Sequence, residues 1–215
     1  MPPIPAATVG RLVTYLRVLT EMEQDGVRSA SSDDLGAVAH VSAFQVRKDL
    51  AYFGRFGTRG AGYTVSTLRR ELRRILGLTR PWHVAIVGMG RLGQALADYP
   101  SFDRQEFRLV AAFDVDPTVI GRRFGSIQVE PLAVLDQVAR ERAIDLAFLT
   151  VPASAAQSAV DALGTAGVRG ILNFAPIVVA APDQVRVEAV DLSAGLQRLT
   201  YYVQSLPETP VEVAG

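Results

Sequence analysis

Residues 83–100 read HVAIVGMGRLGQALADYP, a short apolar run followed by three spaced glycines. The run HVAIV is typical of a strand buried on both faces of a parallel sheet, and a helical pattern begins directly after the glycines. In such a loop Gly88 permits a tight turn, Gly90 lets a pyrophosphate approach the backbone, and Gly93 lets the helix pack close to the strand. The helix N-terminus favours the phosphate charge. The stretch therefore predicts a dinucleotide-binding strand–loop–helix unit.

The next predicted strand, residues 108–115, carries Asp114 near its end, 21 residues after Gly93. A carboxylate at this place accepts hydrogen bonds from the adenosine ribose and repels a 2′-phosphate. The sequence therefore favours NAD(H) over NADP(H). A glycine turn that binds nothing is the alternative interpretation. The candidate ligand contacts in this unit are Gly88, Met89, Gly90, Arg91, Leu92, Gly93, Asp114 and Val115.

Apolar runs and helical patterns alternate over the rest of residues 81–191, which predicts a Rossmann domain, a doubly wound α/β fold around a parallel sheet. The further strands are expected at residues 145–151, 170–174 and 186–190, and the helices at 91–98, 131–142 and 154–166. Ligands of such folds lie beyond the carboxyl ends of the strands. Two strand ends supply candidate nicotinamide contacts, namely Thr150, Val151, Pro152, Asn173, Phe174, Ala175 and Pro176. Ordinary strand-to-loop punctuation by proline is the alternative interpretation.

The first 80 residues differ in both pattern and charge. They hold 12 Arg or Lys side chains and 7 Asp or Glu, whereas residues 81–215 hold 10 and 15, although the whole chain has a formal net charge of zero. A split of this kind suggests that the first part meets a polyanion.

Helical periodicity in this first part predicts a helix–turn–helix. Its helices are expected at residues 7–24, 31–39 and 42–53, followed by one at 66–77. Capping-box patterns introduce the second and third, where Ser31 precedes Asp34 and Ser42 precedes Gln45. The glycine-rich stretch GRFGTRGAGYTV, residues 54–65, predicts a β-hairpin. Together these elements predict a winged-helix domain over residues 1–80.

The predicted recognition helix, residues 42–53, presents polar and basic side chains away from its apolar stripe. Arg47 and Lys48 suit guanine edges or phosphates, and Gln45 suits adenine. Arg59, at the wing, suits a minor groove or a phosphate. The candidate contacts to double-stranded DNA are Ser42, Phe44, Gln45, Arg47, Lys48, Tyr52, Arg59 and Gly60. A solvated basic face is the alternative interpretation.

Composition excludes several classes of function. The absence of cysteine excludes disulfides and thiol catalysis, and two histidines are too few for a multi-histidine metal site, so no metal is expected. No apolar run approaches the length of a membrane span, and the first residues lack the pattern of a secretory signal. We therefore expect a cytoplasmic protein without a membrane partner.

Residues that could transfer a proton to a substrate are scarce in the predicted Rossmann domain. Hydride-transferring enzymes need an acid or base for the substrate proton. This part of the chain has no lysine, and its one histidine, His83, begins the first strand at the wrong end of the sheet. Tyr99 lacks a lysine to lower its pKa. A sensor is therefore favoured over an enzyme, with a small NAD-dependent dehydrogenase carrying a helical appendage as the alternative.

The chain resembles the Rex family of bacterial redox-sensing transcriptional repressors over residues 4–206. The stretch SAFQVRKDLAYFGRFGTRGAGY resembles the recognition helix and wing of the family, VAIVGMGRLGQALADYP its NAD loop, AAFDVD its ribose-binding strand end, and ILNFAP its nicotinamide-side loop. The resemblance implies a homodimer that binds operator DNA when NADH is scarce and dissociates when NADH binds. NAD⁺ is implied to compete for the site without causing release.

The resemblance also implies how the dimer is built and switched. Residues 192–206 would form a C-terminal helix exchanged between subunits, with residues 207–215 as a disordered tail. Arg17 would pair with Asp191 as the switch, and Tyr99 would lie near the nicotinamide. After this aspartate the chain has Leu192 where some relatives carry phenylalanine, so it departs from the family pattern at this one position.

A second, weaker resemblance covers residues 150–174, which are similar to the CoA-binding domain of succinyl-CoA synthetase. It implies a third interpretation, a CoA-binding accessory protein, and leaves residues 1–80 without an explanation.

Overall fold

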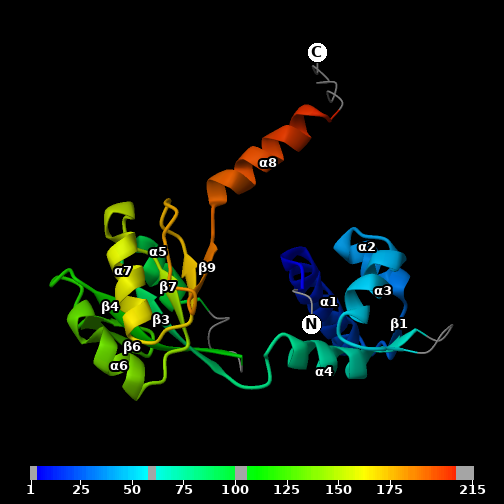
Figure 1. The fold of residues 1–215 in the computed structure, drawn as a ribbon, viewed down its shortest axis with the longest axis horizontal. Coiled ribbons are helices and arrows are strands. Elements are labelled where there is room, and N and C mark those ends of the chain that lie inside the picture. The colour runs from blue at the N-terminus through cyan, green and yellow to red at the C-terminus, as the bar shows by residue number, and fades with distance from the viewer. Residues whose placement is uncertain (1–3, 58–61, 100–105, 207–215) are drawn as a thin grey trace, which may run out of the picture. The chain divides into compact units, whose positions relative to one another are not determined.

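The computed structural model describes residues 4–57, 62–99 and 106–206. It divides into two compact units, residues 1–80 and residues 81–215, and each is described by itself (Figure 1).

The first unit packs helices around one apolar core. Its elements are α1 (Ala6–Gln24), β1 (Ser29–Ala30), α2 (Ser32–Ala39), α3 (Ala43–Ala51), β2 (Tyr63–Thr64) and α4 (Val65–Ile75). Their apolar stripes meet in side chains that are wholly or almost wholly removed from solvent, including Leu12, Leu19, Leu35, Val46 and Leu72. All four predicted helices are confirmed, with shifts of up to two residues at their ends.

Both predicted N-caps of the helix–turn–helix are confirmed. The Ser31 hydroxyl accepts a hydrogen bond from the Asp34 backbone N–H, and the Asp34 carboxylate accepts one from the Ser31 backbone N–H. The Ser42 hydroxyl accepts from the Gln45 backbone N–H at 3.2 Å. Gly36 lies within α2, where a Cβ would be 2.5 Å from the carbonyl oxygen of Val41 in the turn that follows. Glycine at this position therefore lets the turn between α2 and α3 pack closely against α2.

The hairpin predicted within residues 54–65 lies partly outside the described residues. Its described strand β2 pairs antiparallel with β1, with Ser29 opposite Thr64. The β1 partner precedes α2 and was not predicted, because a strand of two residues carries no alternating pattern to detect. Residues 58–61, which include the predicted wing contacts Arg59 and Gly60, lie outside the described residues.

The second unit is the predicted doubly wound α/β domain. Its strands are β3 (Trp82–Val87), β4 (Phe107–Asp114), β5 (Arg123–Phe124), β6 (Ile127–Pro131), β7 (Leu146–Leu149), β8 (Gly170–Asn173) and β9 (Arg186–Ala189). They form one sheet in the order β5-β6-β4-β3-β7-β8-β9, parallel except for β5 against β6. The strands β5 and β6 were not predicted.

Helices cover both faces of this sheet (Figure 1). They are α5 (Arg91–Ala97), α6 (Leu135–Glu141, preceded by a 3₁₀ turn at Leu132–Val134) and α7 (Ala153–Thr165). Side chains of α6 and α7 pack with one face of the sheet in a large apolar cluster, and side chains of α5 pack in a second cluster around Ile86 and Met89. The two buried faces explain why the strands read as continuous apolar runs.

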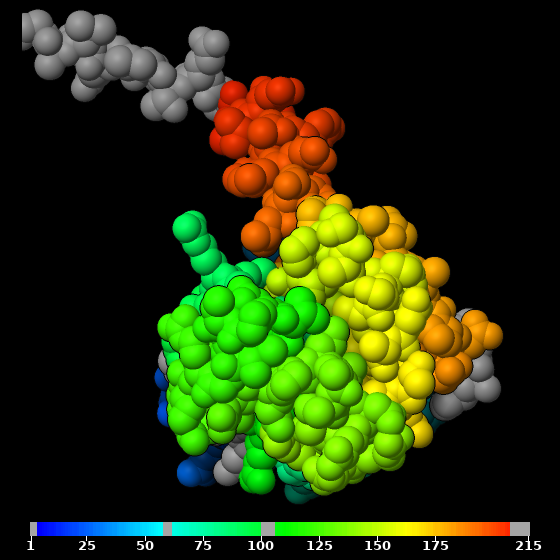
Figure 2. Space-filling view, turned by 90° about the vertical axis from the view of Figure 1, so that its left-hand side faces the viewer, coloured from blue at the N-terminus to red at the C-terminus, as the bar shows by residue number. Residues whose placement is uncertain are grey.

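The last helix, α8 (Leu192–Gln204), is drawn in orange to red in Figures 1 and 2 and has no buried residue. Its apolar side chains are exposed in the single chain. Leu192 is 75% exposed, and the other exposed apolar side chains are Leu196, Leu199, Tyr201, Tyr202 and Val203. An apolar surface of this kind normally contacts a partner.

Candidate functional site

The glycine loop after β3 lies at the carboxyl ends of the central strands, where the strand order reverses and such folds bind ligands. Gly88 has a φ of +98°, and a Cβ there would lie 2.8 Å from the Thr150 carbonyl oxygen. A Cβ at Gly93 would lie 2.0 Å from the Gly88 carbonyl oxygen, whereas one at Gly90 would meet nothing within 4 Å. The space over Gly90 is therefore open to a ligand, and the other two glycines are required by the fold.

Alanine substitutions should separate these roles. Gly93→Ala forces the helix α5 away from the strand and should cost about 1–3 kcal/mol of folding free energy, as overpacking does. Gly90→Ala should leave the melting temperature unchanged and still weaken dinucleotide binding, because its methyl group occupies the open space. Thermal melting with and without dinucleotide measures both. Equal melting temperatures for the two variants would contradict this division of roles.

The Asp114 carboxylate is hydrogen-bonded to the backbone of the glycine loop, residues 88–93. It accepts hydrogen bonds from the N–H of Met89 at 2.5 Å and from the N–H groups of Val115 and Asp116 at 2.7 and 2.9 Å. Asp114 therefore fixes the loop as well as offering oxygens to a ribose. The Met89 side chain is fully buried, so Met89 can face a ligand only through its backbone.

The end of β7 contacts the same loop. The Thr150 hydroxyl donates to the Gly88 carbonyl oxygen at 2.6 Å, and a Cβ added at Gly88 would lie 2.9 Å from Val151 Cγ1. Pro152 follows as the residue before α7. The structure therefore brings the predicted Thr150–Pro152 segment to the glycine loop.

Asn173, at the end of β8, is 2% exposed and shapes the loop that follows it. Its Nδ2 donates to the Ile177 carbonyl oxygen at 3.0 Å, and its Oδ1 accepts from the Ala175 N–H at 2.9 Å. The Phe174 ring packs edge-on against Phe148. Asn173 therefore holds the shape of the predicted nicotinamide-side loop, of which Pro176 is the exposed member.

The remaining predicted ligand contacts are exposed around the loop. Arg91 and Leu92 lie in the first turn of α5, Val115 follows β4, and Tyr99 lies beyond α5 with 55% of its surface exposed. The structure thus presents Arg91, Leu92 and Val115 to solvent at this end of the sheet, whereas Tyr99 follows the opposite end of α5.

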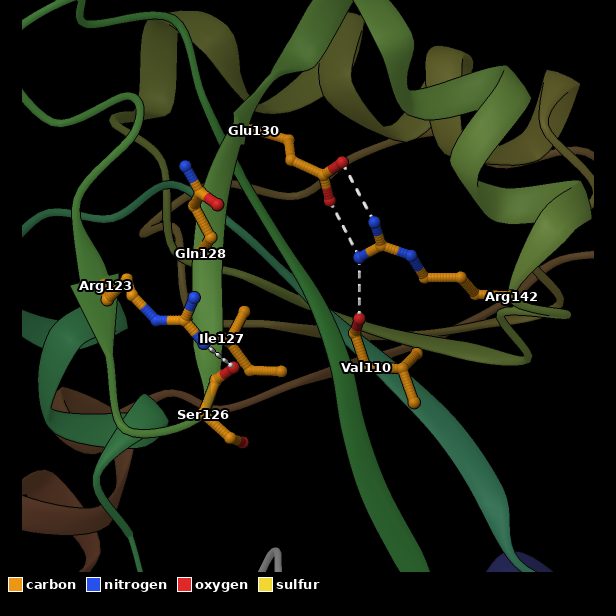
Figure 3. A pocket seen from close by; sticks show the side chains of 7 residues that line it. All are labelled: Val110, Arg123, Ser126, Ile127, Gln128, Glu130 and Arg142. Atoms are coloured by element: carbon orange, nitrogen blue, oxygen red, sulfur yellow. Dashed lines mark hydrogen bonds and ion pairs between the residues drawn. The ribbon is translucent and has the colours of Figure 1, made fainter.

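A pocket elsewhere in this unit contains none of the predicted site residues (Figure 3). Arg142 dominates it, since its guanidinium donates to the Val110 carbonyl oxygen at 2.9 Å and pairs with the Glu130 carboxylate at 2.8 Å. Arg123 donates to the Ser126 carbonyl oxygen on the opposite side. These contacts hold the end of α6 to β4 and β6, which is a structural role.

The predicted recognition helix α3 exposes three of the predicted DNA contacts. Phe44 is 68% exposed, and Arg47 and Lys48 are exposed. Tyr52 is half-buried, and Ser42 is the N-cap. This helix therefore presents an aromatic ring and two cations to solvent.

Gln45 differs from its prediction. It is half-buried, and its Nε2 donates to Asp49 Oδ1 at 2.9 Å, instead of pointing wholly away from the core.

The buried Asp49 was missed by the sequence analysis. Burial raises the pKa of this carboxyl, but hydrogen bonds from Arg11, Gln45 and Tyr15 outweigh burial and hold the pKa below its usual range. Burial and the hydrogen bond to Asp49 raise the pKa of Tyr15. The one available signal was an acidic residue within the apolar stripe of a helix. Its partners Arg11 and Tyr15 lie on α1, 38 and 34 residues away in the sequence.

The two predicted switch residues lie in different units. Arg17 is exposed on α1. Asp191 is the N-cap of α8, and its Oδ1 accepts from the Ala194 N–H at 2.9 Å.

Among the described residues, no helix is long and apolar enough to cross a membrane. The same residues contain no cluster of three His, Asp or Glu side chains suited to a metal ion.

Two family models match the chain. One described as the CoA binding domain matches residues 79–177, and one described as a putative DNA-binding protein N-terminus matches residues 3–51. The redox-sensing transcriptional repressor Rex of Thermus thermophilus is 55% identical over 93% of this chain and 94% of its own length. That of Deinococcus radiodurans is 49% identical over 97% of each chain.

Solved structures match both units together. The crystal structure of RSP in complex with β-NAD⁺ and operator DNA has a TM-score of 0.89 at 36% identity, covering 95% of this chain and 94% of that one. RSP in complex with β-NADH has a TM-score of 0.86 at 34% identity, covering 95% and 96%. RSP is described as a Rex-family repressor.

Proposed function

Since the chain belongs to the Rex family of redox-sensing transcriptional repressors, we propose that it binds operator DNA and releases it on binding NADH. It is a repressor rather than an enzyme, and NADH and NAD⁺ are its effectors. The observation that carries the proposal is one chain holding both an open glycine loop joined to Asp114 and a recognition helix that exposes Phe44, Arg47 and Lys48.

Each part of the chain has a place in this proposal. Residues 1–80 bind DNA, residues 81–191 bind NAD(H), and residues 192–206 form the helix exchanged in a homodimer. The exposed apolar side chains of α8 support this exchange. Because a bacterial operator lies in the cytoplasm, the protein is proposed to act there. The nucleotide site comprises the glycine loop, Asp114 with Val115, Tyr99, and the segments 150–152 and 173–176.

A nucleotide test separates this proposal from the alternatives. NADH should raise the melting temperature of the full chain more than NADPH or CoA does. The chain should bind NADH without oxidising it in the presence of carbonyl compounds. Stabilisation by CoA alone would instead support a CoA-binding protein, and turnover of NADH would support a dehydrogenase.

The recognition helix is tested by Arg47→Ala and Lys48→Ala. Each should lose about 1–3 kcal/mol of operator affinity if its contact is a bidentate base contact. A phosphate contact should instead weaken binding to all duplexes alike and lower the salt slope by about one. Fluorescence anisotropy at several salt concentrations distinguishes the two cases, and full operator affinity in both variants would reject α3 as the recognition helix.

The switch is proposed to be a pair between Arg17 of one subunit and Asp191 of its partner, which favours the DNA-binding arrangement. A ligand shifts a two-state equilibrium only through different affinities for the two states. Breaking the pair by Arg17→Ala should lower operator affinity even without nucleotide and leave NADH affinity equal or higher, as linkage requires. Arg17 is the better residue to replace, because Asp191 also caps α8. Reduced NADH affinity with intact operator binding would contradict the pair.

A further inference from the structure

Asp49 lies on α3 and is fully buried. Its carboxylate accepts hydrogen bonds from several side chains, although the sequence predicted no role for this residue. Its Oδ1 accepts from Thr8 Oγ1 at 3.2 Å, Arg11 Nη2 at 2.7 Å and Gln45 Nε2 at 2.9 Å. Its Oδ2 accepts from Arg11 Nε at 2.6 Å and Tyr15 Oη at 2.9 Å. Donors point at both oxygens, and a proton on either oxygen would compete with them, so this network favours the ionised carboxylate.

Three of the four side chains that donate to Asp49 come from α1. The exception is Gln45, which lies one turn before Asp49 on α3 itself. The carboxylate therefore fixes α3 on α1 and at the same time fixes a side chain at the N-terminal end of α3. That end of a recognition helix is the part that reaches base edges.

The carboxylate also sets the orientation of the Gln45 amide. Because Asp49 can only accept, Gln45 must turn its NH₂ group toward it. One amide hydrogen is then used, and the second hydrogen remains beside Oε1. This pair of a donor and an acceptor matches N7 and the N6 amino group of adenine.

We propose that Asp49 is a positioning residue for sequence-specific DNA recognition, which holds the Gln45 amide in the orientation that reads an adenine. The proposal rests on the proposed function of α3 as the recognition helix. Asp49 itself touches no DNA, so its loss should reduce discrimination between duplexes more than it reduces binding to DNA in general.

The test uses the full chain without nucleotide. The probes are a duplex that the wild-type protein selects from a random pool, a scrambled duplex of the same composition, and copies of the selected duplex with single adenines replaced by 7-deazaadenine. In Asp49→Asn, the NH₂ group of the new side chain faces hydrogen-bond donors that the carboxylate oxygen had accepted from, so the network cannot form completely. We expect affinity for the selected duplex to fall about tenfold or more and affinity for the scrambled duplex to change less than about twofold. The wild-type protein should lose affinity for one 7-deazaadenine copy, and the variant should not discriminate against that copy.

Tyr15→Phe keeps the result decisive if Asp49→Asn does not fold, since it removes one of the hydrogen bonds to Asp49 and retains the ring in the core. It should reduce discrimination in the same direction by a smaller factor. The matched control is Tyr63→Phe, which removes a buried hydroxyl bonded to Ser32 at 2.9 Å in the same unit, away from Asp49. It should lower the melting temperature and leave discrimination unchanged.

Three results would overturn the proposal. The first is that Asp49→Asn and Tyr15→Phe both discriminate between the duplexes as well as the wild-type protein does. The second is that Tyr63→Phe loses as much discrimination as they do, which would indicate general loosening of the domain. The role of Gln45 would also be rejected if the wild-type protein bound every 7-deazaadenine copy as tightly as the selected duplex. Failure of the proposed function is seen separately, because the wild-type protein would then select no duplex from the pool.

Discussion

Replacing Asp114 with alanine is expected to weaken NADH binding about ten- to a hundredfold, since hydrogen bonds to a charged group are worth roughly 1.5–3 kcal/mol. The loss has two sources. The ribose loses its acceptor, and the Met89 N–H of the glycine loop loses the carboxylate that holds it at 2.5 Å. Discrimination against NADPH should relax as well, because a 2′-phosphate no longer meets a negative charge.

Asp116→Ala is the matched control for this variant. Asp116 is exposed in the same turn, and its carboxylate accepts hydrogen bonds from the backbone N–H and the hydroxyl of Thr118. It should bind NADH as the wild-type protein does. Calorimetry that finds unchanged affinities of Asp114→Ala for both NADH and NADPH would show that the ribose role is wrong.

Ending the chain after Asp191 is expected to convert the proposed dimer into monomers or aggregates. The cut removes α8, whose apolar side chains have no buried position in the single chain. If these side chains bury their surface against a partner, their loss removes the main apolar contact of the dimer. Sedimentation or light scattering measures the outcome.

A shorter cut provides the control. Removing residues 207–215 alone retains α8 and should leave the dimer intact. A stable dimer of the chain that ends at Asp191 would rule out the exchanged helix as its main support.

Local chemistry made the glycine loop predictable from the sequence. The requirements of a tight turn and close helix packing act within six residues, and the structure shows both at Gly88 and Gly93. The N-caps Ser31 and Ser42 were predictable for the same reason, because their partners lie three residues away.

Features that depend on distant partners were not predictable. The two-residue strands β1 and β5 have too few residues to show alternation, and pairing alone defines them. Asp49 contacts Arg11, which lies 38 residues earlier in the sequence, and no pattern in α3 predicts that contact. The half-buried position of Gln45 follows from Asp49, so it was missed with it.

The measurement that tests the account most directly is operator binding titrated with NADH and NAD⁺ separately. A labelled duplex selected by the protein is followed by anisotropy in the full chain. The account predicts that NADH releases the duplex, and that NAD⁺ alone leaves it bound while raising the NADH concentration needed for release. A duplex that stays bound at saturating NADH, or that NAD⁺ releases equally well, would contradict it.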